Sequence, residues 1–206
     1  MQGKTGKLFV IAAPSGAGKT SLVREVMQRM PELRFSISYT TRKPRATEQH
    51  THDYFFVAKE QFQEMIDRGE FLEYAQVFDN FYGTSKPQVQ QMLDAGDDVL
   101  LEIDWQGAQQ IRSSMPQAVS IFILPPSRAE LERRLRDRKT DSDEVIARRL
   151  RDSIADMSHW NEFDYVVVND EFAQAVADLA AILSGRGEAL RRDRSGLQTL
   201  IPALLG

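Results

Sequence analysis

The sequence predicts an α/β sandwich of three layers, with a mainly parallel core sheet, an inserted mixed α+β region and a helical lid. Two observations carry this prediction. Short apolar runs, typical of strands buried on both faces, alternate along the chain with segments of helical periodicity. Two stretches, residues 40–96 and 128–151, interrupt that alternation with a different composition.

Core strands are expected at five segments. They cover residues 8–12, 35–39, 99–103, 119–124 and 165–168. Helices are expected at residues 21–30, before Pro31, and at residues 171–183, where one face carries Phe172, Val176, Leu179 and Leu183. We therefore assign the core to residues 1–39, 97–127 and 152–206.

The two interruptions have different characters. Residues 40–96 contain short half-polar strands and two short helices, and their aromatic side chains, concentrated between Tyr54 and Tyr82, predict a small separate core. Residues 128–151 carry nine Lys or Arg against six Asp or Glu, a balance of +3, over a thin apolar stripe. The tail beyond Gly185 is basic and then apolar, and we expect a helix that docks on the core or on a neighbouring subunit.

Composition excludes several classes of protein. The chain has 206 residues and 23.4 kDa, with 42% hydrophobic and 27% charged residues, as in globular proteins with a sizeable core. The net charge of -4 disfavours a general nucleic-acid-binding protein, because such proteins are more often basic overall. With no cysteine and three scattered histidines, neither a disulfide framework nor a zinc cluster is expected. No membrane span or signal-peptide pattern is found, so the expected compartment is the cytosol.

The strongest motif follows the first strand and opens the first helix. It consists of Ala13, Pro14, Ser15, Gly16, Ala17, Gly18, Lys19 and Thr20. Its glycines let backbone N–H groups turn inward on a polyphosphate at a helix N-terminus, while Lys19 neutralises phosphate charge and the Thr20 hydroxyl ligates Mg²⁺. Ala13 replaces the first glycine of the strict motif, a small change that leaves the loop open. The motif predicts binding of a nucleoside triphosphate with Mg²⁺.

Two arginines stand just past the end of the second predicted strand. Arg42 and Arg45 are three residues apart, and guanidinium forks bind phosphate oxygens in pairs. Taken alone, these residues are equally compatible with two solvated surface arginines.

The chain resembles guanylate kinases of the bacterial type, within the phosphate-loop nucleoside monophosphate kinases, from about Gly6 to Ser184. After the phosphate loop come, in order, Ser-x-Thr-Thr-Arg-x-Pro-Arg, Asp-Tyr-Phe-Phe-Val, Glu-Phe-Leu-Glu, Tyr-Gly-Thr-Ser and Ile-Asp-x-Gln-Gly. Each motif apart from the phosphate loop is weak alone, but the series is very specific. The resemblance implies transfer of the γ-phosphoryl group of ATP to GMP, giving ADP and GDP, in purine nucleotide metabolism.

The resemblance also implies a role for individual residues at the GMP site. The positions that hold the GMP phosphate are Arg42, Arg45, Tyr54 and Tyr82. The guanine-binding positions are Ser38, Glu73, Thr84 and Asp104. A carboxylate such as Glu73 accepts from the N1–H and N2–H₂ groups of guanine, and adenine lacks that donor pattern. Asp104 closes a strand near the phosphate loop and could also serve Mg²⁺ through water.

On the ATP side, the resemblance places residues 13–20 on the phosphates and Asn169 near the adenine. The groups implied in catalysis are cations, and these are Lys19, Arg42, Arg134, Arg138 and Arg149. A general base is not required, because the second pKa of a phosphate monoester is about 6 and the acceptor is largely ionised at neutral pH. The resemblance places Arg134, Arg138 and Arg149 on a lid formed by residues 128–151. Without the resemblance, these arginines are interpreted as a solvated helical face.

The chain departs from the family pattern at four places. Ala46 and Thr47 replace a common Pro-Gly before Glu48, Thr51 replaces a glycine, and Glu102 replaces an aspartate. The lid reads Asp-Arg-Lys at residues 137–139 in place of Gly-Arg-Gly. We expect a differently shaped loop before Tyr54 and a less flexible lid, with every essential charge retained.

Two other functions are compatible with parts of this sequence. One is a non-enzymatic guanylate-kinase-like module that binds phosphopeptides, although such modules usually lack a working phosphate loop. The other is a phosphate-loop GTPase or a kinase for another nucleotide, although the Asn-Lys-x-Asp motif of GTPases is missing. ATP and GMP are the expected partners, with no nucleic acid and no membrane. The sequence leaves open whether the chain forms a homo-oligomer.

Overall fold

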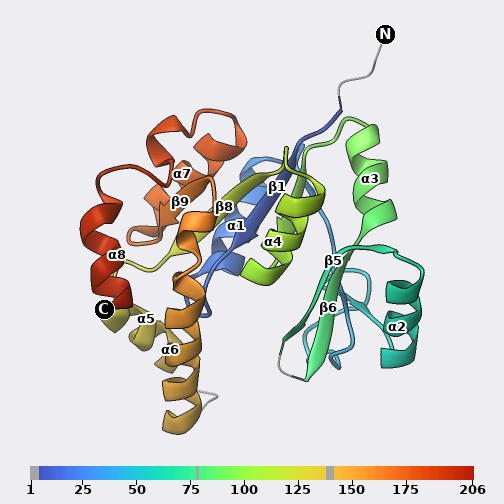
Figure 1. Ribbon diagram of the computed structural model, residues 1–206, viewed down its shortest axis with the longest axis horizontal. Helices are drawn as coiled ribbons and strands as arrows, with labels where there is room; N and C mark the ends of the chain where they lie inside the picture. The colour runs from blue at the N-terminus through green and yellow to red at the C-terminus, as the bar shows by residue number, and fades with distance from the viewer. Residues whose placement is uncertain (1–4, 78, 138–141) are drawn as a thin grey trace. The chain divides into compact units, whose positions relative to one another are not determined.

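The computed structural model describes residues 5–77, 79–137 and 142–206 (Figure 1). They divide into two compact units, the first made of the residues up to Val10 and Glu32–Val119, the second of Ile11–Pro31 and Ser120–Gly206. A parallel five-stranded sheet has the order β2-β7-β1-β8-β9. Its strands are β1 (Leu8–Ala12), β2 (Arg34–Phe35), β7 (Val99–Glu102), β8 (Val119–Leu124) and β9 (Tyr165–Val168).

The strands of this sheet confirm the reading of apolar runs as buried strands. All five residues of β1 are buried, as are five of the six residues of β8. Residues 8–12, 119–124 and 165–168 are predicted with their observed bounds, while β7 ends one residue earlier than expected. An α/β fold with a parallel core sheet is therefore confirmed.

The predicted second strand, residues 35–39, is wrong. The segment contributes to two strands in different sheets, with β2 ending at Phe35 and β3 (Tyr39–Thr40) beginning four residues later. The Ser36 N–H donates to the Leu100 carbonyl at 3.1 Å, whereas the Ser38 carbonyl accepts from the Phe55 N–H at 2.9 Å. The backbone thus changes its pairing partner between these serines, which an alternating pattern of side chains cannot reveal.

The first unit contains a second sheet of order β4-β3-β6-β5. Strands β4 (Phe55–Phe56) and β3 are parallel, and β6 (Asn80–Ser85) runs antiparallel to β3 and to β5 (Phe71–Val77). Helix α2 (Lys59–Asp67) lies beside the β5–β6 hairpin (Figure 1). It buries Phe62, whose ring stacks on those of Phe71 and Phe81 at 4.4 and 5.5 Å. The aromatic rings of residues 40–96 thus pack on one another, while the bounds of the insert stay a prediction.

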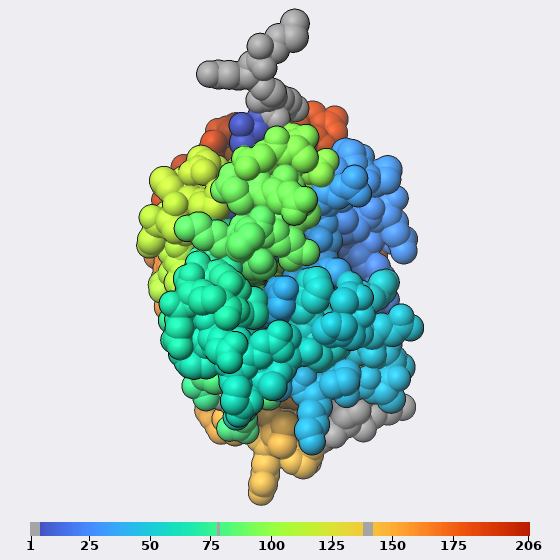
Figure 2. Space-filling model, turned by 90° about the vertical axis from the view of Figure 1, so that its right-hand side faces the viewer, coloured from blue at the N-terminus to red at the C-terminus, as the bar shows by residue number. Residues whose placement is uncertain are grey.

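Two more helices complete this unit. Helix α3 (Lys86–Asp94) begins where the Ser85 hydroxyl accepts from the Gln88 N–H, with Pro87 in its first turn. Helix α4 (Trp105–Ser114) begins at Asp104, whose carboxylate caps it. Figure 2 shows the face of the unit on which residues from about 40 to 95, coloured blue to green, make up most of the surface.

In the second unit, helices α1 (Lys19–Arg29) and α7 (Phe172–Leu183) pack together. Of the four apolar residues expected on one face of α7, Val176, Leu179 and Leu183 are buried, whereas Phe172, the first residue of the helix, is 43% exposed. Helices α5 (Arg128–Arg136) and α6 (Asp143–Met157) begin at the capping hydroxyls of Ser127 and Ser142. They bury apolar side chains of the predicted stripe: Leu131, Leu135 and Ile146.

The tail docks within the second unit. After the short 3-10 helices η1 (Trp160–Glu162) and η2 (Glu188–Leu190), helix α8 (Leu197–Leu205) buries Leu197, Ile201 and Leu204. Arg128 at the start of α5 donates from Nε to the Leu204 carbonyl at 2.7 Å. The expected docking helix is confirmed on the chain's own core. Across the parts of the chain that are described, no helix has the length and apolar character needed to cross a membrane.

Candidate active site

The phosphate loop joins β1 to α1 and depends on two glycines with positive φ. Gly16 has φ 88° and Gly18, the N-cap of α1, has φ 92°, in the left-handed region that favours glycine. A Cβ on Gly16 would come within 2.9 Å of Leu131 Cδ1. The first turn of α1 carries no acidic side chain, so no carboxylate of that turn opposes the favourable field that a helix N-terminus provides for an anion. Lys19 is half-buried there and Thr20 is exposed.

Asn169, which follows β9, supports the phosphate loop through its side chain. The side chain is 4% exposed, and its Nδ2 donates to the Ala17 carbonyl at 2.8 Å. A Cβ on Gly18 would come within 2.3 Å of that same nitrogen, so glycine is needed for the close approach. Arg134 in turn donates from Nη2 to the Asn169 carbonyl at 3.0 Å. The contact of Asn169 with adenine stays a prediction, and its support of the loop was not predicted.

The lid arginines differ in what holds them. Arg134 Nε contacts Glu130 Oε1 at 2.7 Å, and hydrogen bonds from Arg133 and then Arg134 lower the pKa of Glu130 to about 2. This carboxylate therefore stays ionised and fixes the Arg134 side chain. Arg149 is half-buried on α6. Arg138 lies outside the described residues.

Three of the four predicted base-reading residues, Glu73, Thr84 and Asp104, come together in the first unit, where β5 and β6 meet the start of α4. Glu73 is 4% exposed, and Thr84, directly across the β5–β6 ladder, donates from Oγ1 to Glu73 Oε1 at 2.5 Å. Asp104 accepts the Gly107 N–H on Oδ1 at 2.7 Å. A Cβ on Gly107 would lie 2.5 Å from Glu73 Oε2 and 3.3 Å from Asp104 Oδ1. The structure thus brings these two carboxylates to one helix N-terminus, a favourable place for negative charge.

Asp104 acts as a helix cap as well as a candidate ligand, which the sequence analysis missed. The signal was present, because an aspartate between an apolar strand and a helical pattern is a common N-cap. Ser38 is half-buried between β2 and β3. Its backbone carbonyl is used in the second sheet, as described above.

The predicted phosphate-binding residues gather around Arg42. The Arg42 guanidinium lies 5.5 Å from the ring centroid of Tyr54, and that ring meets the ring of Tyr82 edge-on at 6.0 Å. Burial, above all, raises the pKa of Tyr54 to about 12, so its hydroxyl stays protonated at neutral pH and is able to donate to a phosphate oxygen. Arg45 is largely exposed, with 76% of its side chain open to solvent.

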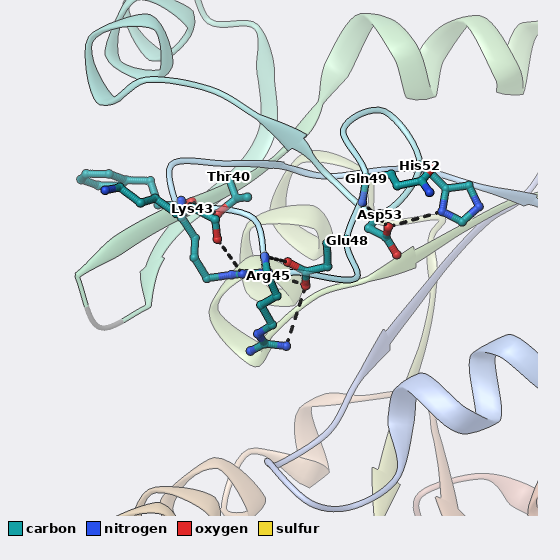
Figure 3. A network of polar contacts seen from close by, with 9 residues as sticks. Thr40, Lys43, Arg45, Glu48, Gln49, His52 and Asp53 are labelled. Carbon is teal, nitrogen blue, oxygen red and sulfur yellow. Dashed lines mark hydrogen bonds and ion pairs between the residues drawn. The ribbon is translucent and has the colours of Figure 1, made fainter. Parts of the chain in front are cut away.

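Glu48 holds the two arginines in place, and the sequence analysis did not assign it to the site. Its Oε1 lies 2.7 Å from Arg42 Nη2, and its Oε2 accepts the Arg45 backbone N–H at 2.7 Å. Figure 3 shows Glu48 beside Arg45 on this loop. The Arg42 hydrogen bond lowers the pKa of Glu48, and the same bond raises the pKa of Arg42. The sequence signal for this role of Glu48 is an acidic residue within six positions of two arginines.

The loop before Tyr54 is closed by local contacts. Thr51, where the family pattern has glycine, has φ 68° and donates its N–H to the Tyr54 carbonyl at 2.9 Å. Asp53 accepts the Gln49 N–H at 2.8 Å, and its contact with His52 is drawn in Figure 3. A threonine in the left-handed region is strained by about 1–3 kcal/mol, which these contacts offset.

A buried strand that leads through a glycine-rich loop into a helix beginning with Lys19 and Thr20 defines a phosphate-loop protein. The family model described as guanylate kinase matches residues 5–186. Over 202 residues the chain is 50% identical to the guanylate kinase of Escherichia coli (strain K12), covering 97% of this chain and 98% of the relative. Identity and coverage are the same with the guanylate kinase of Salmonella paratyphi A.

A crystal structure of guanylate kinase from Anaplasma phagocytophilum matches with a TM-score of 0.74 at 32% identity, over 96% of this chain and 94% of that one. The chain belongs to the guanylate kinase family. It is therefore an enzyme, an ATP:GMP phosphotransferase, and the resemblance stated from the motifs is confirmed.

Proposed function

We propose that the protein transfers the γ-phosphoryl group of ATP to GMP with the residues described above. ATP is held by residues 13–20 of the second unit, and GMP by side chains of the first unit. The observation that carries this assignment is Glu73, a buried carboxylate paired with a hydroxyl at the start of α4. Its carboxylate lies beside the Thr84 hydroxyl and close to Gly107 in the first turn of α4, where a carboxylate is able to accept hydrogen bonds from the donor edge of a base.

Glu73 selects guanine by its hydrogen-bonding pattern. An ionised carboxylate has about four lone-pair sites, so Glu73 is able to accept from guanine N1–H and N2–H₂ while it holds the Thr84 hydroxyl. Adenine presents an acceptor at N1 and would leave the carboxylate without that donor. Ser38, Thr84 and Asp104 complete the proposed base site.

Arg42 and Arg45 bind the GMP phosphate together with the hydroxyls of Tyr54 and Tyr82. Arg42 is restrained by Glu48 and by its donation to the Lys43 carbonyl at 2.9 Å. A restrained guanidinium loses less conformational entropy when it binds an anion. Arg45, largely exposed, adds a more adaptable second cation.

Transfer depends on positioning and on cations. Lys19 neutralises the ATP phosphates, and Arg134, Arg138 and Arg149 approach them as residues 128–151 close as a lid. Residues 40–96 act as the GMP-binding insert. No proton needs to be removed from the acceptor, because the GMP phosphate is largely ionised at neutral pH.

Mg²⁺ accompanies ATP in this proposal. Across the described residues, no three or more His, Asp or Glu side chains are grouped as metal ligands. That fits Mg²⁺, which keeps several waters and binds through substrate phosphates and few protein groups. The Thr20 hydroxyl would hold the ion, and the bound ion would offset phosphate charge. The cytosolic location expected from the sequence stays a prediction.

The test is a coupled assay of phosphoryl transfer from ATP to GMP, AMP, UMP and CMP, with wild type and Glu73→Gln. The amide keeps the size of the side chain but exchanges one acceptor for a donor, which costs about 1–3 kcal/mol of charge-assisted hydrogen bonding. We expect wild type to prefer GMP, and Glu73→Gln to have a higher KM for GMP and a smaller preference over AMP. An unchanged ratio of kcat/KM for GMP and AMP would refute the base-reading assignment.

A further inference from the structure

We propose that Gln110, on helix α4, is a positioning residue that sets the Glu73 carboxylate for guanine recognition. The inference rests on the proposed function of Glu73 and adds a specificity determinant outside the motifs described above. Gln110 holds the next peptide unit of the same strand, at Tyr74.

The contact is a two-point clamp on an edge strand. Strand β5 lies at the end of its sheet, so the peptide groups on its outer side have no neighbouring strand. Gln110 Nε2 donates to the Tyr74 carbonyl at 2.7 Å, and Gln110 Oε1 accepts the Tyr74 N–H at 3.1 Å. The side-chain amide therefore pairs with Tyr74 as the peptide of a further strand would.

The clamp is placed where β5 is irregular. The register of β5 against β6 shifts between Phe71 and Glu73, so the ladder does not by itself fix the strand just before the carboxylate. Bulges re-aim the side chains near them. The Thr84 hydroxyl holds the Glu73 side chain and Gln110 holds the Tyr74 peptide, so the strand is fixed at the two residues where the irregularity ends.

The same face of α4 also provides the space that the carboxylate occupies. Gly107 and Gln110 are three residues apart and so lie on one side of the helix. Gly107 leaves room for Glu73 Oε2, which a Cβ there would approach to 2.5 Å. One helical turn therefore clears the site for the carboxylate and fixes the strand that carries it.

The expected consequence is loss of base discrimination more than loss of turnover. If the strand shifts, Glu73 meets guanine N1–H and N2–H₂ with poorer geometry, whereas the reacting phosphates are held by other residues. The variant Gln110→Met keeps the length of the side chain and removes both hydrogen bonds. We expect KM for GMP to rise about tenfold while kcat at saturating GMP changes less than threefold.

Comparison of GMP with IMP gives a readout that loss of stability would not move. Hypoxanthine keeps N1–H and O6 but lacks the 2-amino group, so the ratio of kcat/KM for GMP over IMP reports how well Glu73 reaches N2–H₂. We expect this ratio to fall about three- to tenfold in Gln110→Met. Gln110→Glu, which keeps the acceptor and removes the donor, should move it in the same direction. Gln91→Met, at an exposed position of α3, is the matched control and should leave it unchanged.

The proposal is overturned if both Gln110 variants keep the wild-type ratio of kcat/KM for GMP over IMP, whether or not their melting temperature falls. Gln110 would then only pair with the exposed edge of the strand. This failure is distinct from failure of the proposed function. If Glu73→Gln lowers the GMP/IMP ratio and the Gln110 variants do not, only the positioning role is wrong. If Glu73→Gln leaves the ratio unchanged, Glu73 does not read the base, and the positioning role fails with it.

Discussion

Arg42 and Glu48 form an ion pair of 2.7 Å, and the other oxygen of the same carboxylate accepts the backbone N–H of Arg45. The side chains of the pair are only 18% and 13% exposed, so solvent screens it less than a surface pair. One carboxylate thus holds the guanidinium of Arg42 and the backbone of Arg45 in the proposed GMP-phosphate site. Glu48 is itself an anion in a site proposed for a phosphate. Its role is therefore tested by the stability of the folded protein as well as by the binding of GMP.

The Glu48→Gln variant should lose stability in a pH-dependent way. The folded protein lowers the pKa of Glu48, so the pair contributes fully above the ordinary carboxyl pKa of about 4.3 and is lost as pH falls through the lowered value. We expect a loss of about 1–2 kcal/mol at pH 7 and a smaller loss at about pH 3. Urea unfolding of both proteins at the two pH values measures it. Glu64→Gln, at an exposed site, is the control, and an equal loss at both pH values would contradict the assignment.

Lys19→Ala should abolish phosphoryl transfer while the fold stays intact. Lys19 is the first residue of α1 and lies in the phosphate loop, outside the apolar core. Its loss removes a cation that would stabilise the transferring phosphoryl group. Steady-state turnover with ATP and GMP, alongside thermal melting, gives the measurement. Turnover above a tenth of wild type would be inconsistent with the proposed role.

Gly107→Ala should disturb base recognition directly. The new methyl group would lie 2.5 Å from Glu73 Oε2 and 3.3 Å from Asp104 Oδ1, so at least the first carboxylate must move. We expect KM for GMP to rise at least tenfold, together with a stability loss of about 1–3 kcal/mol from overpacking. Gly196→Ala, where a Cβ meets nothing within 4 Å, is the control. Wild-type KM in Gly107→Ala would show that Glu73 can be displaced without affecting GMP.

Arg138→Ala tests the lid, although this residue lies outside the described part of the chain. If Arg138 meets the transferring phosphoryl group only on closure, its loss lowers kcat much more than it raises KM for GMP. A charge-assisted contact in a dry site corresponds to roughly 2–4 kcal/mol, or about 30- to 1,000-fold in kcat. Kinetics at saturating ATP with varied GMP would decide. A kcat within threefold of wild type would identify Arg138 as a solvated surface charge.

Strands buried on both faces are marked in the sequence, whereas the choice of backbone partner is not. Runs such as residues 119–124 and 165–168 were located to the residue, because a strand buried on both faces needs an unbroken apolar sequence. Residues 35–39 were misread as one strand, because the choice between two sheets is made by backbone partners from Leu100 and Phe55. Phe172 is exposed although it shares a helical face with buried residues. Helical periodicity does not show how far a neighbouring element extends over the first turn of the helix.

The sequence by itself determined the parallel α/β core, the phosphate loop and, through an ordered series of motifs, membership of the guanylate kinase family. These features reside in local patterns, namely apolar runs, glycine spacing and short runs of functional side chains. Only the tertiary structure decided that Asn169 supports Ala17 and that Gln110 pairs with Tyr74. Contacts between residues 152 and 36 positions apart leave no local pattern, because each depends on how elements distant in the sequence pack.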